Sequence, residues 1–523
     1  MKAPCDEAAI KAGSAAAPHA TNAEPWILAV AILGSSMAFI DGTVVNVALP
    51  ALQKNLGGTV IDMQWVVEGY ALFLSALILV GGSMGDLFGR RRMFLSGVAL
   101  FAIASARCGL APNIHQLVIA RAVQGIGAAF LVPGSLSIIS ASFSEKERGR
   151  AIGTWSGFTA MTTALGPVLG GWLIEHASWR WAFFINLPMA AAVIVLALWR
   201  VPESKNPELK TVDWTGALLA TLGLAGLTYG FVESSNFGWG NPLVWGTLAA
   251  GCVFLAAFIY LESRVESPIV PLQLFRSRDF SGANLLTLFL YAALGIFFFL
   301  YPLNLIQVQG YSATAAGAAA LPFIFLMFLL SRWSGGLVAR YGAKLPLMVG
   351  PVIAATGFLL CAVPSTSGSY WTTFFPGFMV LGLGMAVSVA PLTTVVMSAV
   401  DQNRAGTASG INNAVARVAG LLSVAILGIV MVSAFSSHFN RGVAGLQLSP
   451  DAVQNLQSNE TKLAALTVPA GIDPPTATKI TDAIDRSFVF GFRLVMLICA
   501  AMSLVSALFA WRLIAVGAKQ TPS

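Results

Sequence analysis

Long apolar stretches repeat along the whole sequence, and they constrain the fold more than any other feature. The hydrocarbon core of a bilayer is about 30 Å thick and an α-helix rises about 1.5 Å per residue, so about 20 apolar residues cross it. Charged residues make up only 10% of the chain, against about 25% in soluble proteins. The sequence therefore predicts an all-α membrane protein with fourteen transmembrane helices. The expected spans are residues 26–48, 63–85, 92–111, 115–139, 150–173, 180–200, 213–231, 243–262, 281–303, 314–338, 345–365, 371–398, 407–433 and 488–515.

Basic residues favour one side of the predicted membrane. When the N-terminus is placed inside, most lysines and arginines fall in the inside segments, including the run at 90–92. The short outside loops contain little beyond Lys54, Arg107 and Arg180. This asymmetry follows the positive-inside rule and places both termini in the cytoplasm, as expected for a multi-pass protein of the inner cell membrane. The membrane thereby explains the net charge of +7 without a nucleic-acid partner.

The first and second halves of the sequence resemble each other when one is shifted by 253 residues. Gly82 then coincides with Gly335, and Gly153 with Gly406. We therefore expect two pseudo-symmetric six-helix bundles, with two extra central helices between them. Repeated halves with the working site at their interface are a transporter architecture. The predicted parts are a disordered cytoplasmic tail (1–25), an N-terminal six-helix bundle (26–200), a two-helix insert (201–262), a cytoplasmic linker (263–280), a C-terminal six-helix bundle (281–515) with an extracytoplasmic loop (434–487), and a cytoplasmic tail (516–523).

Three charged residues lie at a similar depth in the predicted spans. Asp41, Glu68 and Arg121 are each about five to seven residues from the outer end of a span, which is about 8–11 Å below the surface. A charge near the bilayer centre costs about 2.5–3.5 kcal/mol, so we expect the three to form one cluster inside the N-terminal bundle. A carboxyl group can take up a proton and an arginine cannot, so this cluster is the predicted proton-coupling site. The alternative is that Asp41 and Arg121 pair only to hold helices together.

A glycine- and arginine-rich segment joins the second and third spans, and it reads GSMGDLFGRRR over residues 82–92. Gly82 and Gly89 allow a tight turn and close helix approach. Asp86 can cap a helix start and pair with a basic residue. The arginines hold the loop on the inside.

This loop resembles the signature loop of the major facilitator superfamily, and four other segments resemble motifs of its fourteen-span drug:proton antiporter branch (EmrB/QacA-type). They are IDGTVVNVALP (40–50), LVIARAVQGIGAA (117–129), GTWSGFTAMTTALGPVLGG (153–171) and INNAVARVAG (411–420). The resemblance covers nearly the whole chain and implies the major facilitator fold. The chain departs from the family pattern at Leu87, where a basic residue is usual, and at Thr162, where another glycine is expected.

The resemblance also implies roles for two groups of residues. The gating motif consists of Gly82, Gly85, Asp86, Gly89, Arg90 and Arg91. The antiporter helix motif consists of Gly153, Gly157, Gly166, Pro167, Gly170 and Gly171. The alternative for Gly166 and Pro167 is that they only kink and pack the fifth span.

Further polar and aromatic residues in the spans are candidates for the wall of a substrate cavity. They are Trp155, Phe158, Tyr291, Phe298, Asn412, Asn413 and Arg417. Arg417 is an intramembrane charge near the middle of the thirteenth span, with the two asparagines close by. Helix packing through the asparagine amides is an equal alternative.

The resemblance implies export of small hydrophobic or cationic compounds by antiport with protons and alternating access. A dedicated exporter of one endogenous metabolite or antibiotic is the alternative within transport, and uptake is a third. A membrane-embedded enzyme or sensor lacks support, because the sequence shows neither a recognisable nucleophile–base motif nor a sizeable soluble output domain.

The sequence predicts no cofactor and no metal. It contains no Walker A motif, so a proton gradient is the expected energy source instead of ATP, and the histidines show no metal-ligand spacing. The expected partners are a small-molecule substrate, protons and the lipid bilayer, and the chain is expected to act as a monomer. The sequence leaves open whether a periplasmic adaptor protein takes part.

Overall fold

The regular structure is entirely helical in the part of the chain that the computed structural model describes, which comprises residues 24–205, 212–265, 268–400, 405–446 and 448–515. The prediction of an all-α membrane protein is confirmed. Within these residues, thirteen helical segments are long and apolar enough to cross a membrane. The fifth predicted span coincides with a fourteenth long helix, Glu145–His176, whose 32 residues also suffice for a crossing. The predicted tails at 1–25 and 516–523 lie almost entirely outside the described residues.

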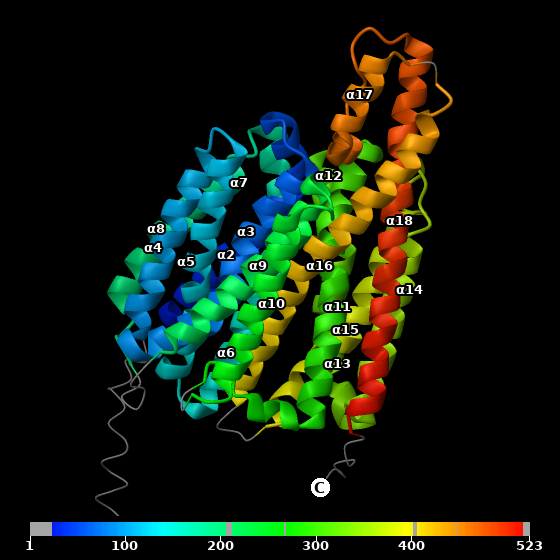
Figure 1. The fold of residues 1–523 in the computed structure, drawn as a ribbon. Helices are drawn as coiled ribbons and strands as arrows, with labels where there is room; N and C mark the ends of the chain where they lie inside the picture. Colours follow the sequence, from blue (N-terminus) through cyan, green and yellow to red (C-terminus); the bar gives the residue numbers. More distant parts are fainter. Residues whose placement is uncertain (1–23, 206–211, 266–267, 401–404, 447, 516–523) are drawn as a thin grey trace, which may run out of the picture.

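The first half of the chain forms one bundle, coloured blue to cyan in Figure 1. Helix α3 packs against α5, α4 packs against α5 and α8, and α2 packs against α6. A continuous apolar core, in which Phe94 and Phe101 are fully buried, fills the centre of this bundle. The helices are α2 (Glu24–Leu56), α3 (Val60–Phe88), α4 (Arg90–Gly109), α5 (Ile114–Ser142), α6 (Glu145–His176), α7 (Trp181–Phe184) and α8 (Asn186–Arg200).

The second half forms a bundle of its own, in which α14 packs against α15 and α18, and α11 packs against α16 and α18. Its helices are α11 (Arg278–Leu303), α12 (Ala313–Ala318), α13 (Leu321–Tyr341), α14 (Lys344–Cys361), α15 (Phe374–Ser398), α16 (Ala405–Val443), α17 (Pro450–Ser458) and α18 (Pro474–Leu513). Three short helical segments complete it, namely η1 (Leu272–Arg276), η2 (Asn304–Val308) and η4 (Glu460–Ala465).

Two helices, α9 (Trp214–Phe237) and α10 (Pro242–Glu262), connect the bundles. Helix α9 packs against α10, α3 and α16, so it contacts both bundles. A hydrogen bond of 2.7 Å from the Trp65 indole nitrogen to Glu233 Oε1 joins α3 to α9. The insert is therefore attached to the first bundle by a polar contact as well as by packing.

Side-chain caps fix where many of the helices begin. Thr59 and Asp62 form a reciprocal capping box at the start of α3. Asn113 caps α5 and Asp213 caps α9 through their side-chain oxygens. Such caps satisfy backbone amides that have no partner inside the helix. They place the helix ends, and thereby the depth of the charged residues in each helix.

The molecule has two distinct ends (Figure 1). We call the end where α2 begins and α18 finishes the terminal face, and the opposite end, which carries α17, the loop face. A short helix, α17, lies within the predicted extracytoplasmic loop and has the Ser449 side chain as its cap. Helix α16 continues to Val443 and α18 already begins at Pro474, so the non-helical part of this segment is shorter than the predicted loop at 434–487.

Candidate transport site

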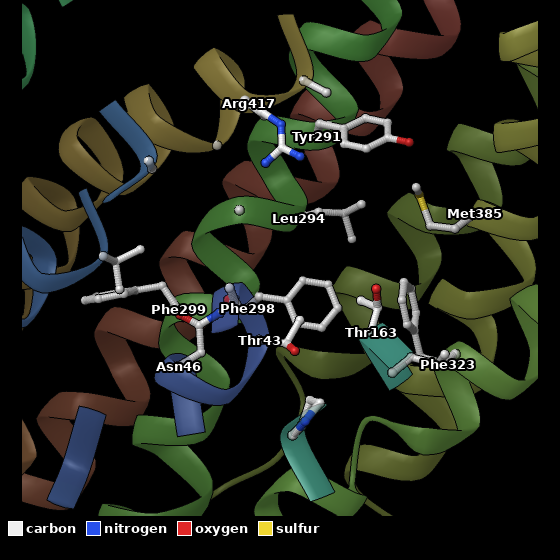
Figure 2. Close-up of a pocket in the computed structure, with 18 of the residues that line it drawn as sticks. Thr43, Asn46, Thr163, Tyr291, Leu294, Phe298, Phe299, Phe323, Met385 and Arg417 are labelled. Carbon is white, nitrogen blue, oxygen red and sulfur yellow. Dashed lines mark hydrogen bonds between the residues drawn. The ribbon is translucent and has the colours of Figure 1, made fainter. Parts of the chain in front are cut away.

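A cavity of about 1290 Å³ lies between the two bundles. Its wall is mostly apolar and takes residues from α2, α3, α5 and α6 on one side and from α11, α13, α15 and α16 on the other. Figure 2 shows Thr43 and Asn46 of α2 across from aromatic and charged side chains of the second bundle. The structure places Tyr291, Phe298 and Arg417 in this wall, as the sequence predicts. The volume and lining suit a small organic molecule.

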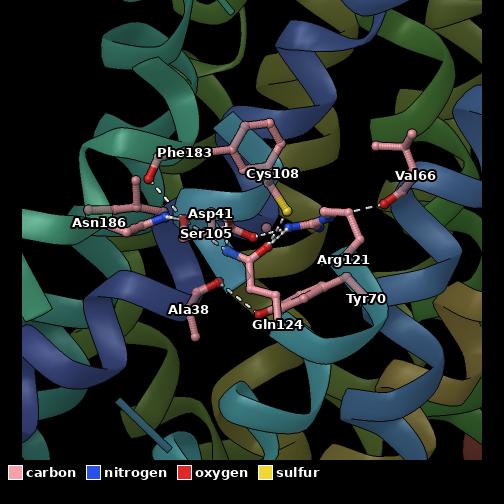
Figure 3. A network of polar contacts seen from close by, with 12 residues as sticks. Ala38, Asp41, Val66, Tyr70, Ser105, Cys108, Arg121, Gln124, Phe183 and Asn186 are labelled. Atoms are coloured by element: carbon pink, nitrogen blue, oxygen red, sulfur yellow. Dashed lines mark hydrogen bonds and ion pairs between the residues drawn. The ribbon is translucent and has the colours of Figure 1, made fainter. Parts of the chain in front are cut away.

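A buried ion pair lies directly behind the cavity wall. Arg121 on α5 pairs with Asp41 on α2, and Arg121 also forms part of the wall. The Arg121 Nε donates to the carbonyl oxygen of Val66 at 3.0 Å, which ties α5 to α3. The Tyr70 ring lies 4.3 Å from the guanidinium carbon in cation–π geometry. One guanidinium group thus connects three helices to the surface that a substrate would contact (Figure 3).

Neutral polar side chains complete the partners of Asp41. The Gln124 amide nitrogen donates to Asp41 Oδ1 at 2.8 Å and the Asn186 amide nitrogen donates to the same oxygen at 3.3 Å. Ser105 accepts from Asn186 at 2.9 Å and donates to the Phe183 carbonyl oxygen at 2.9 Å. Asn186 and Ser105 were not identified from the sequence, although each is a polar residue in an otherwise apolar span. The network fully satisfies the buried carboxylate, as burial requires.

Glu68 does not join this network, so the prediction of one cluster of three charges is wrong. Glu68 is fully buried and lines the cavity, but neither carboxylate oxygen has a hydrogen-bond partner within the described structure. Counting residues from the end of a span predicts how deep a side chain lies in the membrane, but not the direction in which it points. The rotation of α3 about its axis directs Glu68 into the cavity, whereas Asp41 lies inside the first bundle.

Two of the aromatic candidates lie elsewhere. Trp155 packs against the core of the first bundle, and its indole nitrogen donates to Ser35 at 3.0 Å. Phe158 is exposed and is not part of the cavity wall. The predicted cavity roles of Trp155 and Phe158 are therefore wrong. Apolar residues occur all around α6 and its hydroxyl residues are not confined to one face, so the sequence does not reveal which face meets the cavity.

The two asparagine candidates do not line the cavity either. The Asn412 amide nitrogen donates to Thr287 at 2.7 Å and to Asn284 at 3.2 Å, both on α11. Asn413 is exposed and donates to the carbonyl oxygen of Ser409 in its own helix. The alternative of helix packing applies to Asn412, and Arg417 alone of this segment's predicted cavity residues reaches the wall.

The glycines of the α6 motif lie at two helix contacts. Gly166 and Gly170 face Thr43 and Val44 of α2, where an added methyl group would collide with those residues. Gly171 faces the backbone of α12 in the second bundle in the same way. Gly153 has open space around it and lines the cavity, and Gly157 lies within the same helix.

The contact between α6 and α12 is reciprocal and closes the bundles together at the loop face. Gly317 of α12 faces the Pro167 carbonyl oxygen of α6, just as Gly171 faces Ala313. The Thr314 hydroxyl donates to Glu175 Oε2 at 2.5 Å, and this hydrogen bond lowers the pKa of the Glu175 carboxyl group. In contrast, the cavity wall includes Gly153 in the part of α6 near the terminal face. The cavity thus extends toward the terminal face and is sealed at the loop face.

A second set of contacts reinforces this seal. Gln53 on α2 donates to the Lys462 carbonyl oxygen at 3.0 Å and accepts from Gln307 at 2.9 Å. Gln64 on α3 donates to the Val424 carbonyl oxygen on α16 at 2.8 Å. All of these bonds join the first half of the chain to the second near the loop face.

The glycine- and arginine-rich loop is organised by a residue that the sequence analysis did not identify. Glu203, which follows α8, accepts from the backbone amides of Arg91 and Arg92 at 3.1 and 3.2 Å and thereby caps α4. Asp86 forms an ion pair with Arg90 at 2.7 Å. The prediction that Asp86 pairs with a basic residue is correct, and its predicted capping role is wrong because Glu203 takes it.

The loop glycines also differ in what they permit. Gly89 has φ 116° and lies against Glu203, so the turn between α3 and α4 depends on its missing side chain. An added methyl at Gly82 or Gly85 would meet only ordinary contacts. The close helix approach expected at Gly82 occurs instead at the preceding residue, Gly81, which faces the carbonyl oxygen of Ala129 on α5.

No group of three or more histidine, cysteine or acidic side chains that could hold a metal ion is present in the described ranges. The polar groups at the cavity are an arginine of the buried ion pair, an acid, a second arginine and hydroxyls, which suit the binding of an organic molecule.

In the described part of the chain, thirteen apolar helices are long enough to cross a membrane, and two bundles have a cavity between them that is closed at one end. This architecture defines a membrane transporter. The sequence model of the Major Facilitator Superfamily matches residues 31–424, and the chain belongs to this family. The family resemblance inferred from the sequence motifs is confirmed, and the chain has a transport role instead of an enzymatic one.

Several curated relatives are named as resistance or export proteins. The chain is 35% identical to the multidrug resistance protein Stp of Mycobacterium tuberculosis over 92% of this chain and 90% of that protein. It is 33% identical to the tetracenomycin C resistance and export protein of Streptomyces glaucescens, over 92% and 90%. It is 33% identical to the puromycin resistance protein of Streptomyces alboniger, over 83% and 87%.

Solved structures share the fold. A bacterial homologue of the human lysosomal transporter Spinster, in an inward-facing and unoccupied conformation, superposes with a TM-score of 0.64 at 18% identity. The match covers 93% of this chain and 97% of that one. The inward-open xylose transporter of E. coli matches with a TM-score of 0.57 at 15% identity, over 95% and 97%.

Proposed function

We propose that the protein exports small, largely hydrophobic drugs by antiport with protons, through alternating access of the central cavity. The observation that carries this proposal is the buried Asp41–Arg121 pair, whose arginine forms part of the cavity wall. Relatives named for multidrug, tetracenomycin C and puromycin resistance support drugs as the cargo.

The proton step follows from the contacts of Arg121. When Asp41 is ionised, Arg121 holds α5 to α2 through the ion pair and to α3 through Val66. Protonation of Asp41 removes its charge and weakens the link between α2 and α5, because a neutral carboxyl group attracts a guanidinium much less. Arg121 then becomes free to shift at the cavity wall. A proton bound by Asp41 and a substrate bound at the wall thus compete through one side chain, which is the requirement for exchange.

The sealed loop face represents one end state of the cycle. We propose that the terminal face is cytoplasmic, because the basic loops lie on that side of the predicted membrane. In this state Asp41 is ion-paired and the cavity extends toward the cytoplasm, ready to receive substrate. A proton bound from the outside would reset the cycle, and the membrane potential adds about 2.3 kcal/mol per charge per 100 mV.

We further propose that the loop at 82–92 supports the inward-open state. Its ion pairs with Glu203 and within the loop brace the terminal ends of α3, α4 and α8 in one unit. The chain would then work as a monomer in the inner membrane, since the cavity and the ion pair are complete within one chain.

A dedicated exporter of a single compound is the second candidate. The relative named for tetracenomycin C export favours it, because that name refers to one compound. The two candidates differ in breadth of cargo. Transport of several chemically unrelated dyes supports multidrug export, and transport of none of them supports a dedicated cargo.

Reconstituted vesicles test the proposed coupling. A vesicle lumen more acidic than the medium should drive accumulation of ethidium, and an uncoupler should abolish it. ATP should have no effect in the same preparation. Accumulation that persists after the pH gradient and the membrane potential are both collapsed would refute proton antiport.

A further inference from the structure

Two opposite charges without partners line the cavity. Glu68 on α3 belongs to the first bundle and Arg417 on α16 belongs to the second. Both carboxylate oxygens of Glu68 and the Nε of Arg417 are buried without a hydrogen bond. Neither residue takes part in an ion pair among the described residues. The buried ion pair near the cavity joins Asp41 to Arg121 instead. Arg417 lies beside Tyr291 at the cavity (Figure 2).

The register of α3 against α16 shows how these two charges are placed. Gln64 contacts Val424 and Gly428, and Leu79 lies next to Gly410, so the two helices run antiparallel along each other. This register brings Arg417 level with residues 71–73 of α3, about three to five residues from Glu68. Three to five residues correspond to about 4.5–7.5 Å along a helix. The acid and the base therefore face one cavity at depths that differ by about one helical turn.

Leaving both charges unpaired in an apolar cavity is costly, because a buried polar group without a partner loses its solvation. The other charged pair in the wall region avoids this cost through at least four hydrogen bonds to neighbouring groups. A bound molecule that carries both charges would satisfy Glu68 and Arg417 at once. An arginine guanidinium also presents paired N–H donors that match a carboxylate.

We propose that the cavity selects amphiphilic, dipolar substrates whose acidic group is bound by Arg417 and whose cationic or donor group faces Glu68. The aromatic and aliphatic wall, including Phe298 and Met385, then holds the apolar body between the two poles. This inference rests on the proposed drug export and names the substrate class for it. It differs from the expectation of purely hydrophobic or cationic cargo because the cavity binds a molecule with an acidic group more tightly than a purely cationic one.

The test compares rhodamine B, which carries a carboxylate and a delocalised cation, with its cationic ethyl ester. Binding of each dye to the purified full-length protein is measured by fluorescence anisotropy, so that the result does not depend on proton coupling. The wild type should bind the acid about tenfold more tightly than the ester, as expected for a charge-assisted contact. Equal binding of the two dyes, or binding of neither, overturns the proposal.

Variants assign each pole separately. Arg417→Gln should remove the preference for the acid, and Arg417→Lys should retain part of it. Glu68→Gln should weaken both dyes to a similar degree, because both carry the cation, and should leave their ratio unchanged. Arg340→Gln, at an exposed arginine outside the cavity wall, is the matched control and should bind as the wild type does. An unchanged acid-to-ester ratio in Arg417→Gln overturns the role of Arg417.

The competing explanation is that Glu68 and Arg417 pair with each other when the cavity closes. In that case the exchanged double variant Glu68→Arg with Arg417→Glu should recover the dye binding and transport of the wild type. The proposal expects instead that the exchange fails to restore binding, since the poles are reversed relative to the cavity wall. Failure of rhodamine B transport under a pH gradient, with a preserved acid preference in binding, would reject the proposed coupling and leave this inference standing.

Discussion

Arg121 on α5 forms an ion pair with Asp41 on α2 while only 1% and 0% of their side chains are exposed. Water therefore cannot screen either charge, and each depends on the other together with the surrounding amides. Removal of one member of such a pair leaves an uncompensated charge and costs about 3–5 kcal/mol.

Asp41→Asn should strongly reduce transport driven by a pH gradient while substrate exchange continues. The asparagine keeps the shape of the side chain and can still accept from Gln124 and Asn186, but it cannot bind or release a proton. Gradient-driven accumulation should fall at least about tenfold, which corresponds to about 1.4 kcal/mol. Dye counterflow under symmetrical pH measures exchange in the same vesicles. Gradient-driven accumulation at the wild-type rate would show that Asp41 is not the coupling residue.

Arg121→Lys should be more damaging than Asp41→Asn, although it preserves the charge. A lysine ammonium cannot reach Val66, Asp41 and Gln124 together with the fork geometry of a guanidinium. We expect loss of counterflow as well as of coupled transport, and a lower midpoint of thermal unfolding in detergent. Gel filtration with fluorescence detection distinguishes folded from aggregated protein, and wild-type counterflow in this variant would contradict the proposed role of the arginine fork.

Gly171 and Gly317 should be required for closure at the loop face. Each lies against the backbone of the opposite helix, where small residues permit close approach. Gly171→Val should hold α6 and α12 apart and reduce the transport rate at least about tenfold. This reduction corresponds to an activation free energy that is higher by about 1.4 kcal/mol. Closure can be measured by cross-linking between Glu175→Cys and Thr314→Cys, whose native side chains lie 2.5 Å apart at their oxygens.

The matched control for that prediction is Gly246→Val on α10, where an added side chain meets nothing within 4 Å. This variant should cross-link and transport as the cysteine background does. Undiminished cross-linking in Gly171→Val would show that the helix contact at the loop face tolerates a larger residue.

The sequence predicted the class of fold because the membrane imposes a strong and local rule on each helix. Apolar runs of sufficient length are visible one at a time, without knowledge of how the helices pack. Asp41 and Arg121 were also found from the sequence, because a charge in an apolar span needs a partner or a proton. The sequence therefore identifies residues, such as charges in apolar spans, whose burial is energetically unfavourable whatever their neighbours are.

What the sequence could not reveal is the rotation of a helix and the identity of distant partners. Lipid and protein core are both apolar and α6 has no single polar face, so Trp155 could not be assigned to the bundle core from the sequence. The contact between Arg91 and Glu203 joins residues more than a hundred positions apart. Glu203 follows a span end, where a solvated charge is ordinary, and its capping role depends entirely on the packing of α4 beside α8.

Glu203→Ala should destabilise the start of α4 by a modest amount. Its carboxylate satisfies the amides of Arg91 and Arg92 and lies near the positive end of the α4 helix dipole. Because the side chain is 27% exposed, we expect a loss of only about 1 kcal/mol. Thermal unfolding in detergent measures it, and Glu203→Gln, which keeps an acceptor oxygen, should lose less. Identical unfolding of Glu203→Ala and the wild type would refute the capping role.

Asp485 should make the folded protein less stable as the pH rises through weakly acidic values. It lies on α18 before the apolar stretch that begins at Phe488, outside the predicted span. Burial, and to a smaller extent the neighbouring Asp482, raises the pKa of its carboxyl group from 3.8 to about 6. The unfolded chain therefore releases this proton at lower pH than the folded chain, so the free energy of unfolding decreases between about pH 4 and 6 and stays lower above that window.

Asp485→Asn should raise the midpoint of thermal unfolding at about pH 7.5 but much less at about pH 4.5. Asp451→Asn, at an exposed position, is the control and should show no such difference. Equal effects of Asp485→Asn at both pH values would mean that the stability of α18 does not depend on the ionisation of this carboxyl group.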